Sequence, residues 1–192
     1  WAEPSNMSNI MILNPRVLMT FTAIVSLSVA VSAGGLRIGP KASVFYPSDK
    51  KTRNAFGGTW YGFGLGPVGT TGPREKSRLD SDLRIMSRDS RGNRFFMLSP
   101  SFGPMVTLGD PNQRGFVPYA AVRVGPAYFD YAVGSGNARI KKKRLGFNLN
   151  AEVGATLSDS GRLSLRYDTM SRFDGFKFDG LSLEFMFSLG RL

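Results

Sequence analysis

Leu-Ser-Leu-Glu-Phe-Met-Phe-Ser-Leu, residues 181–189, alternates between two kinds of side chain. Large apolar residues take every odd position, and the even positions carry serine, glutamate, methionine and serine. Side chains along a strand point alternately to opposite faces, so this stretch predicts a β-strand with one apolar and one mostly polar face. The same alternation recurs in residues 145–157 and 162–168, and in all three segments the apolar face carries no charge.

Five further segments of similar length show strand-like patterns, so the sequence predicts eight strands in all. The five are residues 36–46, 57–67, 77–87, 95–108 and 117–128. Pro100 and Pro104 lie on the apolar face of the fourth segment, and because proline cannot donate to a strand ladder we expect a bend or an interruption there. An even strand number places both ends of the chain on one side, so the longer loops would share the other side. These loops are residues 47–54, 86–94, 130–144 and 169–180.

A chain of 192 residues is long enough for one substantial domain. It carries 25 Lys and Arg against 14 Asp and Glu, a formal charge of +11. These charges are scattered and no nucleic-acid-binding motif accompanies them, which argues against nucleic acid as a partner. The chain has no Cys and no His, so thiolate chemistry and the commonest metal ligand are both missing, and we expect no metal and no cofactor.

The amino-terminal part of the chain predicts an export signal. A short region ends at Arg16, an apolar run covers Val17–Val31, and Val31-Ser32-Ala33 offers small residues at the cleavage positions. The alternative is a membrane-anchoring helix, but the run is shorter than the ~20 apolar residues that a spanning helix needs. We therefore expect upstream residues and a cleaved signal peptide over residues 1–33 and a single β-barrel domain over residues 34–192.

The composition of the polar face indicates which face is inside. In a soluble sandwich the solvent-facing side would carry many Lys, Glu and Thr, whereas here Gly, Ser and Asn dominate beside a few charges of both signs. Such a face suits a narrow interior, and the strands are close to the ~9–11 residues that a tilted strand needs to cross a bilayer. The sequence thus predicts an all-β fold, an eight-stranded antiparallel up-and-down transmembrane β-barrel. A secreted soluble β-barrel that binds a hydrophobic ligand within its apolar face is the alternative.

Val-Pro-Tyr-Ala-Ala-Val-Arg-Val-Gly-Pro-Ala-Tyr at 117–128 and Phe-Asp-Gly-Leu-Ser-Leu-Glu-Phe-Met-Phe at 178–187 extend this pattern. With the signal peptide and the eight segments, they resemble the small bacterial outer-membrane barrels represented by the OmpA membrane domain, OmpX and OmpW. The resemblance covers nearly the whole mature chain and is one of pattern. It implies export through the inner membrane, insertion by the barrel-assembly machinery and contact with outer-membrane lipid. Members usually end in an aromatic residue, whereas this chain continues through Gly190-Arg191-Leu192.

The charged residues of the polar faces predict a network that closes the lumen, because a buried charge needs a partner. We expect Glu152, Arg166 and Glu184 to meet at mid-barrel. Asp80 and Asp82 suggest a cation site, but flanking arginines make ion pairing the better interpretation. The predicted network comprises Arg37, Lys41, Arg78, Asp80, Asp82, Arg84, Arg123, Glu152, Arg162, Arg166, Asp168 and Glu184.

Two other motifs have competing interpretations. Gly64–Gly69 fits the G-x-G-x-x-G dinucleotide pattern, but that site needs a helix to begin there, and Pro67 and the glycines favour a strand and a turn. The basic run Lys141, Lys142, Lys143 and Arg144 either contacts anionic lipid headgroups or forms a solvated loop end.

These features predict a non-enzymatic outer-membrane barrel with an envelope-structural or surface-interaction role. Enzymes of this class generally use an active-site histidine, which the chain lacks, and no unpaired acidic dyad stands out. A second hypothesis is a conduit for small apolar solutes, which an apolar lining near Trp60, Phe95 and Met97 would favour.

Overall fold

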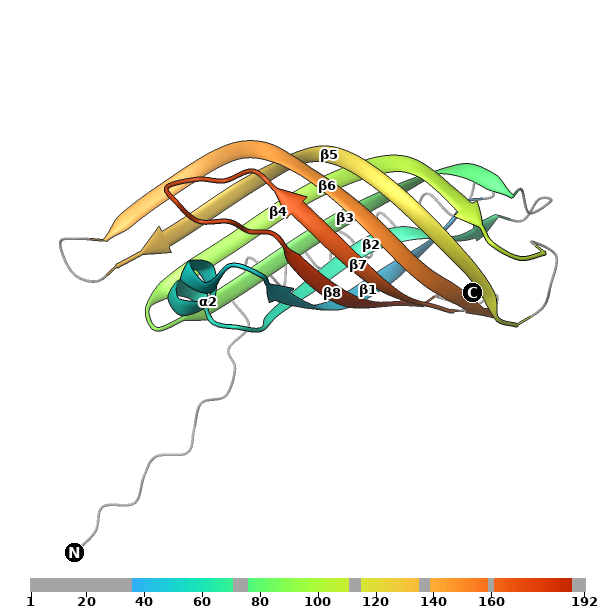
Figure 1. Ribbon diagram of the computed structural model, residues 1–192, viewed down its shortest axis with the longest axis horizontal. Helices are drawn as coiled ribbons and strands as arrows, with labels where there is room; N and C mark the ends of the chain where they lie inside the picture. Colours follow the sequence, from blue (N-terminus) through green and yellow to red (C-terminus); the bar gives the residue numbers. More distant parts are fainter. Residues whose placement is uncertain (1–35, 71–75, 111–114, 135–138, 159–160, 188–192) are drawn as a thin grey trace, which may run out of the picture.

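Eight strands and one short helix make up this computed structural model, which describes residues 36–70, 76–110, 115–134, 139–158 and 161–187. In chain order they are β1 (Leu36–Pro47), α2 (Lys50–Phe56), β2 (Trp60–Thr70), β3 (Ser77–Ser90), β4 (Asn93–Thr107), β5 (Val117–Val133), β6 (Ile140–Ser158), β7 (Gly161–Met170) and β8 (Gly180–Phe187). Each strand pairs antiparallel with its neighbours, and β8 pairs with β1, so the sheet closes into a barrel (Figure 1). The predicted eight-stranded antiparallel barrel is confirmed.

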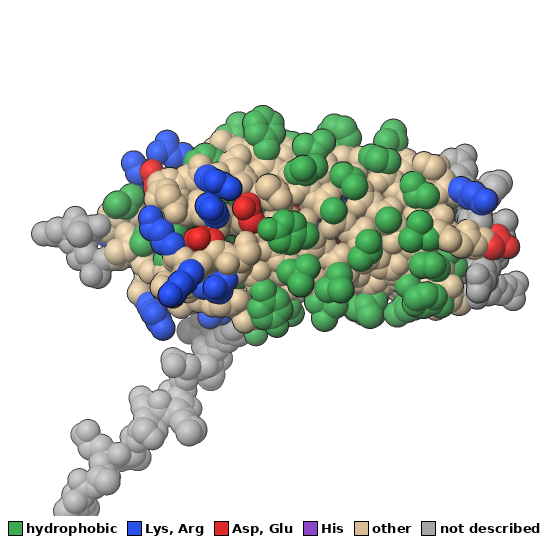
Figure 2. Space-filling model, in the orientation of Figure 1, with side chains coloured by type: hydrophobic (Ala, Val, Ile, Leu, Met, Phe, Trp, Pro, Cys, Tyr) green, Lys and Arg blue, Asp and Glu red, His purple; other side chains and the backbone are tan. Residues whose placement is uncertain are grey.

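The apolar face of the strands points outward. On β8, Leu183 and Phe185 are 49% and 45% exposed, whereas Ser182 and Glu184, which alternate with them, are buried. Apolar side chains cover the barrel wall in the space-filling view (Figure 2). A soluble barrel with an apolar interior is therefore the wrong alternative, because its apolar face would have to be the buried one.

The barrel wall is taller on one side than on the other. β5 and β6 contain 17 and 19 residues, whereas β7 and β8 contain 10 and 8. The ladder between β5 and β6 continues to Val133↔Ile140, so most of the loop predicted over residues 130–144 is strand, and that prediction was wrong. Strand structure persists there because Phe129 and Tyr131 keep the inward alternation and pack inside the barrel. The basic run Lys141–Arg144 consequently lies on β6.

A helix replaces part of the loop predicted over residues 47–54. Asp49 caps the start of α2 by accepting a hydrogen bond from the Thr52 N–H at 2.8 Å. Gly57 ends the helix with a φ of 90°, a conformation that glycine adopts without steric cost. Phe56, in the last turn, is fully buried and holds the helix across one end of the barrel (Figure 1).

The prolines of β4 disturb only one of its two ladders. β4 pairs with β3 without a break from Ser90↔Asn93 to Ser77↔Val106. On the β5 side the ladder stops after Leu98↔Tyr128 and resumes in the same register at Phe102↔Val124. Pro100 lies in this gap without an N–H to donate, so the expected interruption occurs on the β5 side alone.

Parts of the sequence prediction fall outside the described residues, namely the signal peptide over 1–33 and the chain end at 190–192. No helix in the described part of the chain has the length and apolarity that a membrane-spanning helix needs.

Candidate functional site

The barrel interior is filled by two layers of side chains that differ in chemistry. An aromatic layer lies next to α2, and a charged layer lies farther from it. The inward face of β4 shows the order: Phe95 and Met97 come first, Ser99 and Ser101 follow, and Met105 lies at the far end. An eight-stranded barrel has an interior just wide enough for side chains to fill.

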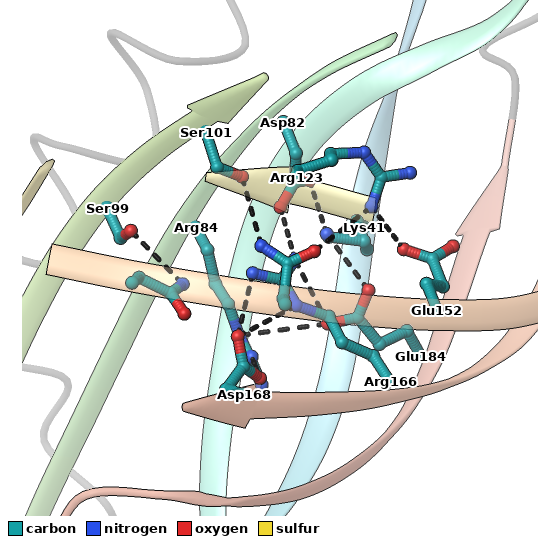
Figure 3. A network of polar contacts seen from close by, with 12 residues as sticks. Lys41, Asp82, Arg84, Ser99, Ser101, Arg123, Glu152, Arg166, Asp168 and Glu184 are labelled. Carbon is teal, nitrogen blue, oxygen red and sulfur yellow. Dashed lines mark hydrogen bonds and ion pairs between the residues drawn. The ribbon is translucent and has the colours of Figure 1, made fainter. Parts of the chain in front are cut away.

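A group of six buried charges, here called the central network, occupies the middle of the lumen (Figure 3). Arg166 hydrogen-bonds to Asp82 and also pairs with Asp168, with Nη2 2.9 Å from Oδ1. Lys41 bridges Asp82 and Glu184, its Nζ lying 3.0 Å from Glu184 Oε2. The network comprises Lys41, Arg84 and Arg166 as cations and Asp82, Asp168 and Glu184 as anions. Three charges of each sign therefore balance.

A second group, the Arg123 network, lies beside it. Arg123 Nη2 is 2.5 Å from Asp80 Oδ2, and its Nη1 is 2.6 Å from Glu152 Oε2. The Tyr119 hydroxyl donates to Glu152 Oε1 at 2.5 Å. Arg162 completes the group at a greater separation, its Nη1 lying 3.9 Å from Asp80 Oδ2.

The partners differ from those expected from the sequence. Asp80 and Asp82 pair with cations across the lumen, Arg123 and Arg166 among them, and not with the arginines that flank them on β3. Arg166 lies 3.9 Å from Glu184, as expected at mid-barrel. Glu152 is opposite Arg166 in the ladder of β6 and β7, but its carboxylate binds Arg123. Closure of the narrow barrel brings side chains of opposing strands together, and their proximity across the lumen determines which charges form ion pairs.

Two residues of the predicted network stand apart from the central and Arg123 networks. The Arg78 side chain is only partly buried, and its Nη2 lies 3.7 Å from the Met105 sulfur. The side chain of Arg37 lies outside the described part of the structure. The Gly64–Gly69 segment belongs to β2, so no helix begins there and the dinucleotide interpretation does not apply.

The aromatic layer was not predicted from the sequence. Trp60 and Phe95 have ring centroids 4.4 Å apart, and Phe178 stacks on Phe129 at 5.4 Å. Phe56 of α2 packs edge-on against Phe95, at 5.7 Å. Trp60, Phe95 and Met97, named above as a possible channel lining, are fully buried and packed. Aromatic residues at inward positions near one end of β1, β2, β4 and β5 were the available signal. The layer includes Phe45, Phe56, Trp60, Met86, Phe95, Met97, Phe129, Tyr131, Met170, Phe176 and Phe178.

Hydrogen bonds tie α2 and residues 171–179 together over this layer. Thr52 Oγ1 donates to the Lys177 carbonyl at 2.8 Å, and the Ser48 N–H donates to the Asp179 carbonyl at 2.8 Å. Asn93 Nδ2 donates to the Ala55 carbonyl at 2.7 Å, which attaches the helix to the β3–β4 turn. The aromatic layer is thus capped from outside by two chain segments.

The outer surface around this cap is strongly cationic (Figure 2). Lys141 and Lys143 lie on the outward face of β6 in line with Leu145, which is 75% exposed. A surface hollow of about 510 Å³ at the β3–β4 turn is lined partly by Arg91, Arg94 and Arg139. The exposed cations of this end are Lys50, Lys51, Arg53, Arg91, Arg94, Arg139, Lys141, Lys143, Arg144, Arg172 and Lys177. Within the described residues, no cluster of three or more Asp, Glu, His or Cys could hold a metal ion.

The sequence matches no protein-family model and no curated protein. Among solved structures, the outer membrane enzyme PagL is similar, with a TM-score of 0.47 and 13% identity over 80% of this chain and 99% of that one. That protein is an enzyme, so the prediction that this chain is not an enzyme was wrong as a deduction from its fold.

Two other solved structures match more closely in shape. The N-terminal β-barrel domain of Pseudomonas aeruginosa OprF has a TM-score of 0.54 and 12% identity over 79% of this chain and 97% of that one. Ail, the attachment invasion locus protein of Yersinia pestis, has a TM-score of 0.52 and 12% identity over 79% of this chain and 95% of that one. Both are bacterial β-barrel proteins, and the likeness concerns the fold. The chain therefore has the fold of the small eight-stranded bacterial outer-membrane β-barrels.

Proposed function

We propose that this chain is an outer-membrane anchor whose cationic end contacts the anionic headgroups of the surrounding lipid. In this proposal residues 1–33 are removed on export. Residues 34–192 form a single barrel domain, which the barrel-assembly machinery inserts into the membrane. The role of the protein is envelope-structural or surface-interacting. The concentration of exposed Lys and Arg at the α2 end, next to the apolar band of the wall, carries the proposal (Figure 2).

Most of the cations at this end lack a carboxylate partner. In the described part of the chain, the ion pairs here join Arg94 to Asp130 at 3.5 Å and Arg144 to Asp174 at 3.8 Å. Both pairs are partly exposed and contribute little to stability. The excess positive charge remains available to phosphate groups outside the protein.

The position of the basic run on β6 fits lipid better than bulk solvent. Lys141 and Lys143 share the outward face with Leu145, Phe147 and Leu149, which are 50–75% exposed and belong to the apolar band. Two residues along a strand advance ~7 Å, so the lysines follow directly above the apolar rows. Headgroup phosphates lie at that level when the band is embedded in the bilayer.

The conduit hypothesis has less support. Its apolar lining exists, but Trp60, Phe95 and Met97 are fully buried in a packed layer beneath α2. An apolar solute would have to displace that layer and then pass the central network.

Native mass spectrometry of the barrel released from membranes that contain phosphate-bearing anionic lipid tests the proposal. We expect anionic lipid to stay bound to the unmodified protein and to be lost from the Lys141→Gln/Lys143→Gln variant. The matched control is Lys50→Gln/Lys51→Gln, which removes two cations from the top of α2 and should retain lipid. Added salt should weaken retention, because exposed charges are screened. Equal lipid retention by the two double variants would contradict the proposal.

A further inference from the structure

Two arginines at the far end of the lumen, opposite α2, meet at a sulfur atom. Arg162 Nη2 lies 3.0 Å from the Met105 Sδ, and Arg78 Nη2 lies 3.7 Å from the same atom. A thioether is a weak acceptor and carries no charge, so it neutralises neither guanidinium group. Two like charges are thereby held close together where Arg162 is only 2% exposed.

Several donors of these arginines have no acceptor. Arg78 Nε, Arg162 Nε and Arg162 Nη1 are buried without a hydrogen-bond partner. Asp80 is the carboxylate paired with Arg162, at 3.9 Å, and its Oδ2 already accepts two bonds from Arg123, at 2.5 and 3.1 Å. Because a buried donor without an acceptor is costly, this end of the lumen is incomplete as a protein-only network.

A comparison of the charges in the two networks also indicates that this end of the lumen is incomplete. The central network holds three cations and three anions, as described above. Around Asp80 the cations are Arg78, Arg123 and Arg162, whereas the anions are Asp80 and Glu152. The Tyr119 hydroxyl already donates to Glu152 and supplies no further negative charge. Among these described side chains around Asp80, one positive charge is therefore left over.

We propose that this end of the lumen binds a small oxyanion of the phosphate class between Arg78 and Arg162. One monoanion balances the extra charge, and its oxygens accept from the unpaired guanidinium N–H groups. Asp80 Oδ1 is also buried without a partner. It can accept a hydrogen bond only from a ligand that carries a proton, and at neutral pH phosphate carries one or two protons, the monoanion two, whereas sulfate carries none. Phosphate is accordingly favoured over sulfate.

The proposed site begins near the edge of the barrel. Arg78 is the second residue of β3 and is only partly buried, and the adjacent Lys76 and Ser77 are exposed. Met105, Tyr119 and Ala121 form a small buried cluster on the same end, and the Tyr119 ring supports Arg162 at 4.8 Å from its centroid. Entry from this edge would not require an anion to cross the central network.

Titration calorimetry of the whole barrel in a zwitterionic detergent, at constant ionic strength made up with chloride, tests the site with inorganic phosphate and with sulfate. We expect saturable phosphate binding that is at least about tenfold tighter than sulfate binding. Arg78→Gln should weaken phosphate binding about tenfold or more, because each charge-assisted hydrogen bond contributes about one such factor. Arg162→Gln should abolish it.

Arg91→Gln, at the α2 end, is the control and should leave phosphate binding unchanged. If the Arg162→Gln variant does not fold, phosphate binding by the Arg78→Gln variant, at a partly exposed position, decides the outcome alone. Absence of phosphate binding, sulfate binding as tight as phosphate binding, or undiminished binding in Arg78→Gln would each overturn the proposal.

Discussion

Arg166 lies in the lumen with no exposed surface, and its guanidinium group contacts Asp82, Asp168 and, at 3.9 Å, Glu184. A charge in such a place is tolerated only while its partners remain. The alternation of β7 was enough to predict from the sequence that Arg166 points inward. Its partners were less predictable, because the residues that face each other across a lumen depend on how the sheet closes.

Replacing Arg166 by glutamine should lower the free energy of unfolding by about 3–5 kcal/mol, since it leaves three buried carboxylates short of a cation. Urea-induced unfolding of the barrel in lipid vesicles measures this. Arg166→Lys keeps the charge and should lose less. The exposed Lys50→Gln serves as control and should lie within about 0.5 kcal/mol of the unmodified protein. An Arg166→Gln midpoint equal to that of the control would show that the network does not stabilise the fold.

At the scale of elements, the outward face of β6 offers two positions at which the cost of a charge should differ with depth in the membrane. Leu145 and Leu149 both point outward, with 75% and 50% of their surface exposed, but Leu145 adjoins the basic run and Leu149 lies four residues deeper. Asn150, on the opposite face, lies 3.4 Å from Arg123 Nη1. The Asn150→Arg variant would place a second cation beside Arg123. This lumen position is therefore a poor control for the effect of a charge introduced on the lipid face.

Leu149→Arg should lower the free energy of unfolding by about 2–4 kcal/mol, and Leu145→Arg by only about 0–1 kcal/mol, because the cost of a charge falls toward the membrane surface. Refolding into vesicles followed by denaturant titration gives both values. The two variants share strand, face and residue change, so depth is the variable. Equal losses would mean that the apolar band does not extend from Leu145 toward Leu149 as the structure implies.

The helix α2 was missed because its seven residues are too few to show a helical period, and Lys50–Asn54 is wholly polar. Its stability comes from outside the helix, through the cap at Asp49 and the burial of Phe56. The hydrogen bond from the Thr52 N–H, the largest cause, lowers the pKa of Asp49. The cap therefore contributes fully above the unfolded pKa of about 3.9 and is lost as the pH falls through the lower folded value.

Amide hydrogen exchange of Thr52 reports on this cap. We expect Asp49→Ala to destabilise the first turn by about 1 kcal/mol and to accelerate exchange at pH values above the pKa of Asp49. In the unmodified protein protection should decline in acid, below the lowered pKa of Asp49. Asp49→Asn keeps a capping oxygen that does not titrate, so its protection should not show this decline. A decline of the same size in Asp49→Asn would assign the pH dependence to another group.

At the scale of the whole molecule, the lumen is sealed twice, by the aromatic layer under α2 and by the central network, which Figure 3 shows. The alternation in residues 181–189 and its repeats predicted the strands, because a period of two can be read along the chain, and the composition of the polar face predicted which face points outward. The aromatic layer was not predicted because Trp60 and Phe95 occupy positions of the face that is otherwise polar or small. Only the closed barrel shows that these positions gather at one end.

Single-channel recording of the unmodified barrel in planar lipid bilayers tests the central claim, a membrane-spanning barrel with a filled lumen. The account predicts that the protein inserts, as verified by its heat-modifiable mobility on gels, and that it shows no large, steady conductance at moderate voltage. Arg166→Gln, with an unbalanced network, should show more frequent brief openings than the unmodified protein. A large and steady conductance from the unmodified protein would contradict the account, because ions could then pass both layers while the barrel remains folded.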